Sequence, residues 1–120
     1  MMKEVEVDLH GYHPYSIEGL IENLVQQAWE IGVSGLKLIH GHGHNRGNSF
    51  PQFVHTNTGF LGLTVRSALR RRVWRDGELR RYMLVKFDTS DSGVTTVRLR
   101  PNPNPSRTKF DDLPERDYDF

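Results

Sequence analysis

The chain has 120 residues, of which 36% are hydrophobic and 26% are charged, a composition that suits a single globular domain. It contains no cysteine, which excludes disulfide frameworks, cysteine-ligated zinc sites and a thiol nucleophile. No apolar run approaches the ~18 residues of a membrane span, and the N-terminal segment lacks a signal-peptide pattern. We therefore expect a cytoplasmic protein without a membrane partner.

The net charge of +1 hides an uneven distribution along the chain. Residues 1–59 carry a net charge of −3, residues 60–100 carry +6, and residues 101–120 carry −2. A basic segment of this kind can follow the phosphates of a nucleic acid. The alternative is an arginine-rich helix face that only contacts solvent, and composition leaves both interpretations open.

The first half of the chain has the pattern of a strand, a helix and a second strand. Apolar and polar residues alternate over residues 5–10, which predicts a strand with two different faces. Ser16 is the predicted N-cap of a helix whose apolar residues recur at helical spacing until Gly32 ends it. Residues 36–40 predict the second strand, which stops at Gly41.

The second half begins with a long loop, from Gly41 to about Gly62, and loops of this length are often functional. A helix is predicted over residues 63–75, and strands over 82–88 and 94–100, joined as a hairpin by a short polar link. The order β-α-β-α-β-β predicts an α/β domain over residues 1–100, a two-layer α+β sandwich with a mixed four-stranded sheet. Residues 101–120 contain four prolines and are predicted to be extended or mobile, although aromatic residues in such a tail often dock on a surface.

Three polar side chains come at the ends of the first two predicted strands. A strand–helix–strand crossover makes its strands parallel, so both end at one edge of the sheet, where open α/β sheets bind ligands. Asp8 and His10 end one strand and His40 ends the other, so we expect these candidate catalytic residues to converge. A carboxylate beside an imidazole fixes its tautomer and supports its protonated form. Taken singly, each residue is better explained as a cap or as a satisfied buried side chain.

The stretch from His40 to Gly47 alternates histidine with glycine and is the sharpest local signal. Glycines let backbone amides approach an anion, which favours phosphate binding over a dinucleotide site, since no helix starts directly from these glycines. The alternating histidines also leave a metal site open, and a divalent ion (Mg or Mn) is a conceivable cofactor, although no ligand set is predicted. The candidate phosphate-binding residues of this stretch are Gly41, His42, Gly43, His44 and Arg46.

Arg66 and Arg70 lie four residues apart and are expected on one face of the second helix. If the N-terminus of that helix points at the strand edge, both arginines flank the glycine loop. Arginine binds phosphate with a forked geometry, so we predict that both contact the backbone of a nucleic acid.

Asp8-Leu9-His10-Gly11 after the first strand and His40-Gly41-His42-Gly43 after the second resemble the two signatures of the Smr (small MutS-related) domain, a DLHG-type motif and an HGxG motif. The resemblance covers about residues 4–100. It implies a fold similar to the C-terminal domain of translation initiation factor three, nucleic-acid binding, and endonuclease or nicking activity in many members. The family's motif positions are then Asp8, His10, Gly11, His40, Gly41 and Gly43, and Gly11 joins the candidate nucleic-acid contacts. Residues 45–62 depart from the family, in which the glycine motif leads within a few residues into the helix.

The leading hypothesis is an endonuclease that cleaves DNA or RNA by acid–base chemistry, with one histidine taking a proton and another protonating the leaving oxygen. RNA supplies its own 2′-hydroxyl nucleophile, whereas DNA needs an activated water, for which a metal is the common solution. The alternatives are a non-catalytic module that binds RNA, DNA or ribosomal complexes and, less favoured, a metal-dependent hydrolase of small phosphorylated substrates. The partner is DNA or RNA in the first two cases, and a monomer is assumed.

Overall fold

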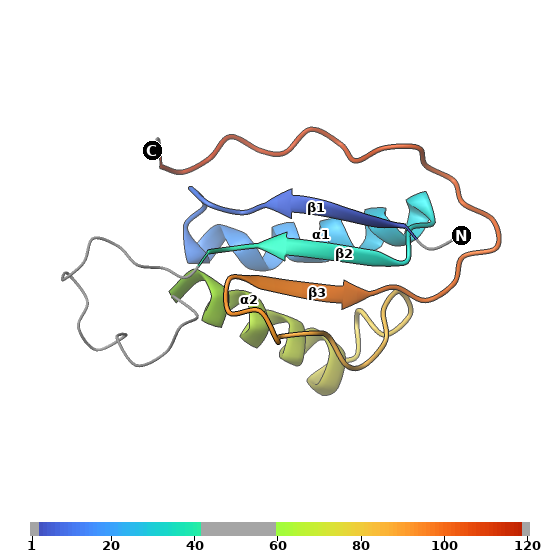
Figure 1. Cartoon of the computed structure of the whole chain (residues 1–120), viewed down its shortest axis with the longest axis horizontal. Helices are drawn as coiled ribbons and strands as arrows, with labels where there is room; N and C mark the ends of the chain where they lie inside the picture. The colour runs from blue at the N-terminus through green and yellow to red at the C-terminus, as the bar shows by residue number, and fades with distance from the viewer. Residues whose placement is uncertain (1–2, 42–59, 119–120) are drawn as a thin grey trace.

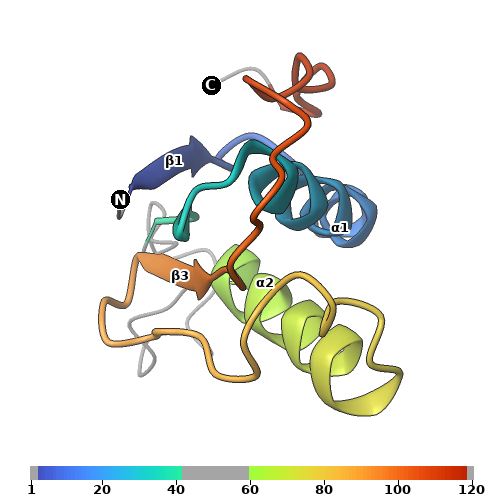
Figure 2. The same cartoon turned by 90° about the vertical axis from the view of Figure 1, so that its right-hand side faces the viewer.

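The computed structural model describes residues 3–41 and 60–118. In chain order, the described elements are β1 (Glu4–Asp8), α1 (Pro14–Ile31), β2 (Gly35–Ile39), α2 (Phe60–Arg70), a π-helical turn (Arg71–Arg75) that continues α2, and β3 (Val94–Arg98). The strands form one layer, and both helices pack on the same face of the sheet (Figures 1 and 2). The predicted two-layer arrangement of helices against a mixed sheet is therefore confirmed.

The sheet has the order β1-β2-β3. β1 and β2 are parallel, as the strand–helix–strand pattern predicts, and Asp8 lies opposite Ile39 in their register. β2 and β3 are antiparallel, with Ile39 opposite Val94. The C-terminal ends of β1 and β2 and the beginning of β3 thus lie at one edge of the sheet.

The prediction of a four-stranded sheet is wrong for the described residues, because residues 82–88 do not form a strand. This segment runs beside β3 but pairs with it only at two isolated bridges, Met83 with Leu99 and Asp88 with Thr96. Between the bridges the segment advances five residues while its partner advances three. The two extra residues bulge outward and break the ladder, which leaves Leu84 and Val85 exposed.

The first helix starts earlier than predicted. His13, not Ser16, is the N-cap of α1, and its Nδ1 accepts a hydrogen bond from the backbone N–H of Tyr15 (3.1 Å). Pro14 suits the first helical turn, where its missing N–H has no partner to lose. Gly32 ends the helix as predicted, in the left-handed conformation (φ 94°).

The core fills the space between the sheet and the two helices. One face of β1 and β2 contributes Val7, Leu36 and Leu38, and the apolar stripes of α1 and α2 cover it. In the described parts of the chain, no helix combines the length and apolarity needed to cross a membrane.

Beyond β3, residues 101–118 form an extended segment, which we call the tail. It turns at the end of the sheet and then runs back along α1 towards the end of β1 (Figure 1). Phe110 and Leu113 pack, partly buried, against the core. A segment too polar to build a core of its own is thus held against the core of the domain.

Candidate functional site

The edge at which β1 and β2 end brings three loops together. Leu9 donates its backbone N–H to the carbonyl oxygen of Ile39 (2.8 Å), which continues the β1–β2 pairing one residue past the strand. The backbone N–H groups of His40 and Gly41 both donate to the carbonyl oxygen of Gly93 (3.0 Å each). The two predicted motifs therefore follow neighbouring strands at one edge of the sheet.

Asp8 and His10 form a hydrogen-bonded pair on the face of the sheet that the helices do not cover. Nδ1 of His10 lies 2.9 Å from one carboxylate oxygen of Asp8, and the His10 backbone N–H donates to the other (3.0 Å). Because a carboxylate only accepts, Nδ1 carries a proton, and in the neutral ring Nε2 has the lone pair. About half of each side chain is exposed, 56% for His10 and 49% for Asp8, so the pair is open to a solvent-borne substrate.

The environment of Asp8 stabilises its ionised form. Partial burial raises the pKa of this carboxyl, but the hydrogen bonds from the backbone and ring of His10 and the charges of His10 and Arg116 outweigh it. The pKa of Asp8 therefore lies below its ordinary value of 3.8. Asp8 is a carboxylate at neutral pH and can support a positive charge on the imidazole.

His40 lies at the same edge but on the opposite face. It follows directly after β2 and continues the spacing of two set by Leu36 and Leu38, so its side chain turns towards the helices, where only 5% of the residue is exposed. Nδ1 of His40 contacts the carbonyl oxygen of Gly41 (3.1 Å), and Nε2 contacts the hydroxyl of Thr95 (2.9 Å). The prediction that Asp8, His10 and His40 converge is therefore correct for the edge and wrong for the face.

Arg66 belongs to the same buried group as His40. Its Nε donates to the hydroxyl of Thr95 (2.8 Å), and its Nη2 donates to the carbonyl oxygens of Asp91 (2.8 Å) and Val94 (3.0 Å). Only 8% of Arg66 is exposed, and burial, together with the charge of Arg70, lowers its pKa against the weaker pull of nearby carboxylates. Arg66 thus fastens α2 to the start of β3.

Arg70 is placed differently. It is exposed, and its guanidinium carbon lies 5.8 Å from the centre of the Phe87 ring. The prediction that Arg66 and Arg70 share one phosphate-facing surface is therefore wrong, because the burial of β3 against α2 takes Arg66 into the interior.

The two motif glycines that the structure describes have positive φ angles, 87° at Gly11 and 76° at Gly41. A side-chain carbon at Gly41 would meet no described residue within 4 Å, whereas one at Gly11 would lie 3.0 Å from Cδ of Arg116 and 3.2 Å from the carbonyl oxygen of Tyr118. Both positions thus favour glycine by conformation, and Gly11 also by close packing. The other predicted phosphate contacts, His42, Gly43, His44 and Arg46, lie outside the described residues.

Sequence reasoning missed Arg116, which the tail brings to the Asp8–His10 pair. Its Nη1 donates to the backbone carbonyl oxygens of Asp8 (3.1 Å) and His10, and its guanidinium carbon lies 4.8 Å from the centre of the Tyr12 ring. These residues are more than a hundred positions apart, so no local pattern could have revealed the contact.

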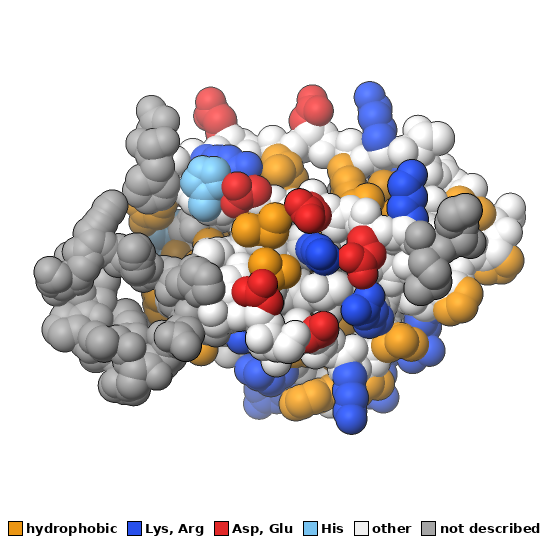
Figure 3. All heavy atoms as spheres, in the orientation of Figure 1, with side chains coloured by type: hydrophobic (Ala, Val, Ile, Leu, Met, Phe, Trp, Pro, Cys, Tyr) orange, Lys and Arg blue, Asp and Glu red, His pale blue; other side chains and the backbone are white. Residues whose placement is uncertain are grey.

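Much of the basic segment is neutralised by neighbouring acids. On α1, Glu18 pairs with Arg71 (2.9 Å), and Glu18 and Glu22 both pair with Arg72. Lys and Arg side chains remain visible along the lower border of the view in Figure 3, whereas the sheet face carries both signs of charge. Glu4, for example, pairs with Arg98 (2.8 Å) on that face. From the last residue of α2 onwards, the exposed basic residues are Arg70, Arg75, Arg80, Arg81 and Lys86.

A family model for the Smr domain matches residues 7–100. The chain belongs to the Smr domain family. The match contains both motifs and ends before the tail. The crystal structure of the Smr domain of Thermus thermophilus MutS2 is 27% identical to this chain, with a TM-score of 0.52, and the similarity covers 80% of this chain and 98% of that one. The comparison with curated proteins gives no match.

The Smr family is a nucleic-acid-binding, nuclease-related family, which fits the predicted partner class. Within this Smr domain, the motif residues Asp8 and His10 form an exposed pair, whereas the motif residue His40 lies in a buried group with Arg66 and Thr95. The exposed pair has the chemistry of an acid–base site, and the buried group holds the edge of the sheet in shape.

The described residues offer few ligands for a metal ion. Over residues 3–41 and 60–118, no three side chains of the His, Asp and Glu types gather closely enough to hold one. Asp8 is one oxygen donor, and each of its oxygens accepts a hydrogen bond from His10. His42 and His44, the further candidate donors of the motif loop, lie outside the described residues.

Proposed function

We propose that this Smr domain is an endonuclease that cleaves phosphodiester bonds with Asp8 and His10 as its acid–base pair. The observation that carries the proposal is the exposed, hydrogen-bonded carboxylate–imidazole pair at the carboxyl edge of a parallel strand pair. The nuclease-related character of the family supports the same reaction class.

His10 acts first as a general base in this proposal. Its Nε2, which carries no proton while Nδ1 bonds Asp8, takes a proton from the attacking hydroxyl. The Asp8 carboxylate then stabilises the imidazolium, which returns the proton to the leaving oxygen. Acid–base catalysis of this kind contributes ~10²–10⁴-fold to the rate.

His40 serves as a positioning residue rather than as the second acid–base group predicted from the sequence. The carbonyl of Gly41 can only accept, so Nδ1 of His40 carries the proton and Nε2 accepts a hydrogen bond from the Thr95 hydroxyl. A ring held in this way on the inner face fixes the loop after β2 relative to β3.

RNA is the substrate that these residues support best. The 2′-hydroxyl of RNA attacks the adjacent phosphorus while the bond to the 5′-oxygen breaks, and one proton moves from the 2′-oxygen through His10 to the 5′-oxygen. DNA lacks this internal nucleophile and would require an activated water, for which a bound metal is the common solution. We therefore expect cleavage of RNA in the presence of a chelator.

The test is a cleavage assay on labelled RNA and on supercoiled DNA, each with and without chelator. We expect wild-type protein to cut RNA in both conditions and His10→Ala to lose at least a hundredfold in rate. His13→Ala is the matched control, because His13 caps α1 nearby and does not contact Asp8. Equal rates for wild type and His10→Ala would refute the proposal.

A non-catalytic module that binds nucleic acid is the second candidate. It is favoured by the burial of His40 and Arg66, which gives these positions a structural use that requires no chemistry. It predicts salt-sensitive binding that Arg70→Ala weakens while His10→Ala leaves it intact, with no cleavage of either substrate. No observation in the described residues favours a hydrolase of small phosphorylated substrates.

A further inference from the structure

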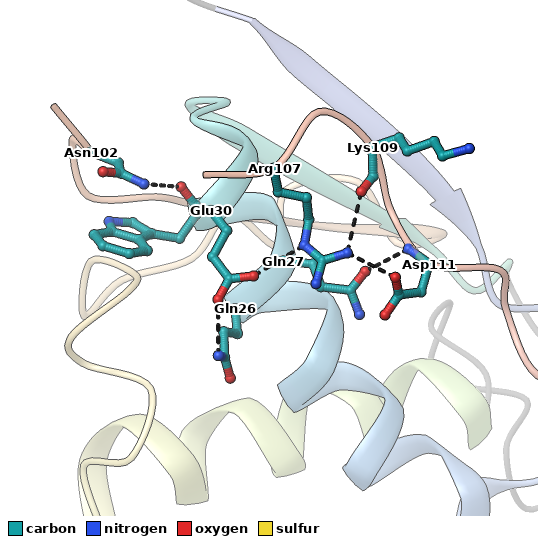
Figure 4. A network of polar contacts seen from close by, with 8 residues as sticks. Gln26, Gln27, Glu30, Asn102, Arg107, Lys109 and Asp111 are labelled. Carbon is teal, nitrogen blue, oxygen red and sulfur yellow. Dashed lines mark hydrogen bonds and ion pairs between the residues drawn. The ribbon is translucent and has the colours of Figure 1, made fainter. Parts of the chain in front are cut away.

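The tail lies outside the family match, which ends at residue 100, yet it is fastened to the domain along its length. At the C-terminal end of α1, Arg107 pairs with Glu30 (3.1 Å) and, within the tail, with Asp111 (2.8 Å) (Figure 4). The backbone N–H of Asp111 donates to the side-chain oxygen of Gln27 (2.8 Å). Asn102 donates to the carbonyl oxygen of Trp29 (2.7 Å). These contacts fix the course of the tail along α1.

The far end of the tail is fastened to the loop that carries the DLHG motif. The backbone N–H of Tyr118 donates to the carbonyl oxygen of Gly11 (2.8 Å), and the hydroxyl of Tyr12 donates to the carbonyl oxygen of Pro114. Asp117 accepts hydrogen bonds from the backbone N–H of His13 and the hydroxyl of Ser16 (2.8 Å each). Residues 114–118 therefore form one wall of the loop after β1.

Arg116 occupies the centre of that wall. Its stem packs against Gly11, where a side-chain carbon would lie only 3.0 Å from Cδ, and its guanidinium lies over the Tyr12 ring. Nη1 alone makes the two hydrogen bonds to the carbonyl oxygens on either side of Leu9. In the described part of the chain, Nε and Nη2 make no hydrogen bond, and the side chain is only half-buried.

We propose that the tail is a functional part of the site, and that Arg116 binds a phosphate of the nucleic acid next to the scissile bond. Nη1 holds the loop that bears His10, and the donors on Nε and Nη2 face the substrate. The forked arrangement of these donors matches two oxygens of one phosphate. The inference rests on the proposed function for the identity of the substrate, and it names a contact that the matched domain does not contain.

No nearby acid forms an ion pair with this guanidinium among the described residues. The carboxylate of Asp8 is bonded to His10, and that of Asp117 is bonded to the start of α1. The charge of Arg116 acts on Asp8 through space and helps to lower its pKa, whereas the guanidinium itself contacts neutral carbonyls and an aromatic ring. An arginine so placed attracts an anion to the exposed side of the pair.

The experiment measures the affinity for a labelled single-stranded RNA at several salt concentrations, using the full chain. The variants are Arg116→Ala, Arg116→Lys and the control Arg107→Ala, which removes the same charge from the tail at its other anchor. We expect Arg116→Ala to weaken binding at least fivefold and to reduce the slope of log affinity against log salt by about 0.7, the value for one phosphate contact on a single strand. Arg116→Lys should restore the slope, and Arg107→Ala should keep it. Circular dichroism verifies that each variant is folded.

The outcomes separate this inference from the proposed function. A wild-type protein that cleaves RNA while Arg116→Ala keeps the full salt slope would overturn the inference and leave the function standing. A protein that never cleaves but loses one phosphate contact in Arg116→Ala would overturn the function and support the inference. Equal losses in Arg116→Ala and Arg107→Ala would show that the tail acts only as a structural support, which also overturns the inference.

Discussion

The hydroxyl of Thr95 joins the two buried polar side chains of the site, so Thr95→Val is the most informative single change. Thr95 is fully buried, and its hydroxyl accepts from Nε of Arg66 (2.8 Å) and contacts Nε2 of His40 (2.9 Å). Valine has nearly the same shape but offers neither hydrogen bond. The change therefore replaces the hydroxyl by a methyl group, which removes the two hydrogen bonds and keeps the packing.

The magnitude follows from the two partners that lose their bond. A buried polar group left without a partner costs ~1–3 kcal/mol, and the added methyl returns ~0.8 kcal/mol. Arg66 keeps its bonds to Asp91 and Val94, and His40 keeps its contact with Gly41, which limits each loss. We expect the free energy of unfolding to fall by about 2–4 kcal/mol, or a melting temperature lower by roughly 8–16 °C at ~4 °C per kcal/mol.

The assay is urea and thermal denaturation followed by circular dichroism, with Thr96→Val as the matched control. Thr96 is the next residue of β3 and is similarly buried (7% exposed), but its hydroxyl makes no hydrogen bond with the described residues. The control should change the free energy of unfolding by no more than about 0.5 kcal/mol. If Thr95→Val unfolds at the same denaturant concentration as Thr96→Val, the buried Arg66–Thr95–His40 group does not stabilise the edge of the sheet.

Three further predictions concern the loop after β1. Gly11→Ala should destabilise the domain by at least ~1 kcal/mol because the φ angle of Gly11 is 87° and the tail packs closely against it. Gly19→Ala, on an open helix surface, should stabilise the domain by about 0.5–1 kcal/mol. Denaturation midpoints of the two variants that move in the same direction would contradict this. Asp117→Asn should lower the melting temperature at neutral pH and match wild type in strong acid. The hydrogen bonds from His13 and Ser16 lower the pKa of Asp117 despite slight desolvation. The stabilisation by this carboxylate is therefore present above pH 3.8 and is lost as the pH falls through the lowered pKa. A difference from wild type that does not change with pH would show that the charge of Asp117 does not stabilise the fold. Asp8→Asn should slow RNA cleavage at least tenfold with unchanged RNA affinity, since an amide cannot support the imidazolium, and a rate equal to wild type would remove Asp8 from the mechanism.

The alternation in the sequence was sufficient to place Asp8 and His10 together, because side chains two residues apart in a strand share a face. The same rule places His40 with Leu36 and Leu38 on the inner face, but the prediction considered only where the strands end. The order and direction of the strands decide which residues lie at one edge of the sheet. The alternation of side chains between the two faces decides which of those residues can contact each other.

Other parts of the structure were beyond any local pattern. The interior position of Arg66 depends on the approach of β3, which supplies carbonyl acceptors 25 to 28 residues away in the sequence. The proline content of the tail predicted an extended chain, but its contacts with α1 and the DLHG loop form between residues about a hundred positions apart. The helices and the parallel pairing of β1 with β2 followed from periodicity, whereas the strand predicted over residues 82–88 failed because its bulge is set by the unequal lengths of two paired segments.

The clamp of the tail on the DLHG loop affects the order in which the protein is completed during its synthesis. Pro114, Arg116 and Tyr118, which fasten this loop, are synthesised more than a hundred residues after the loop residues that they contact. The sheet and both helices can therefore assemble before the wall of the site exists, since chains fold from the N-terminus as they emerge. A nascent chain would then carry a folded scaffold whose DLHG loop lacks this wall until residues 114–118 have emerged.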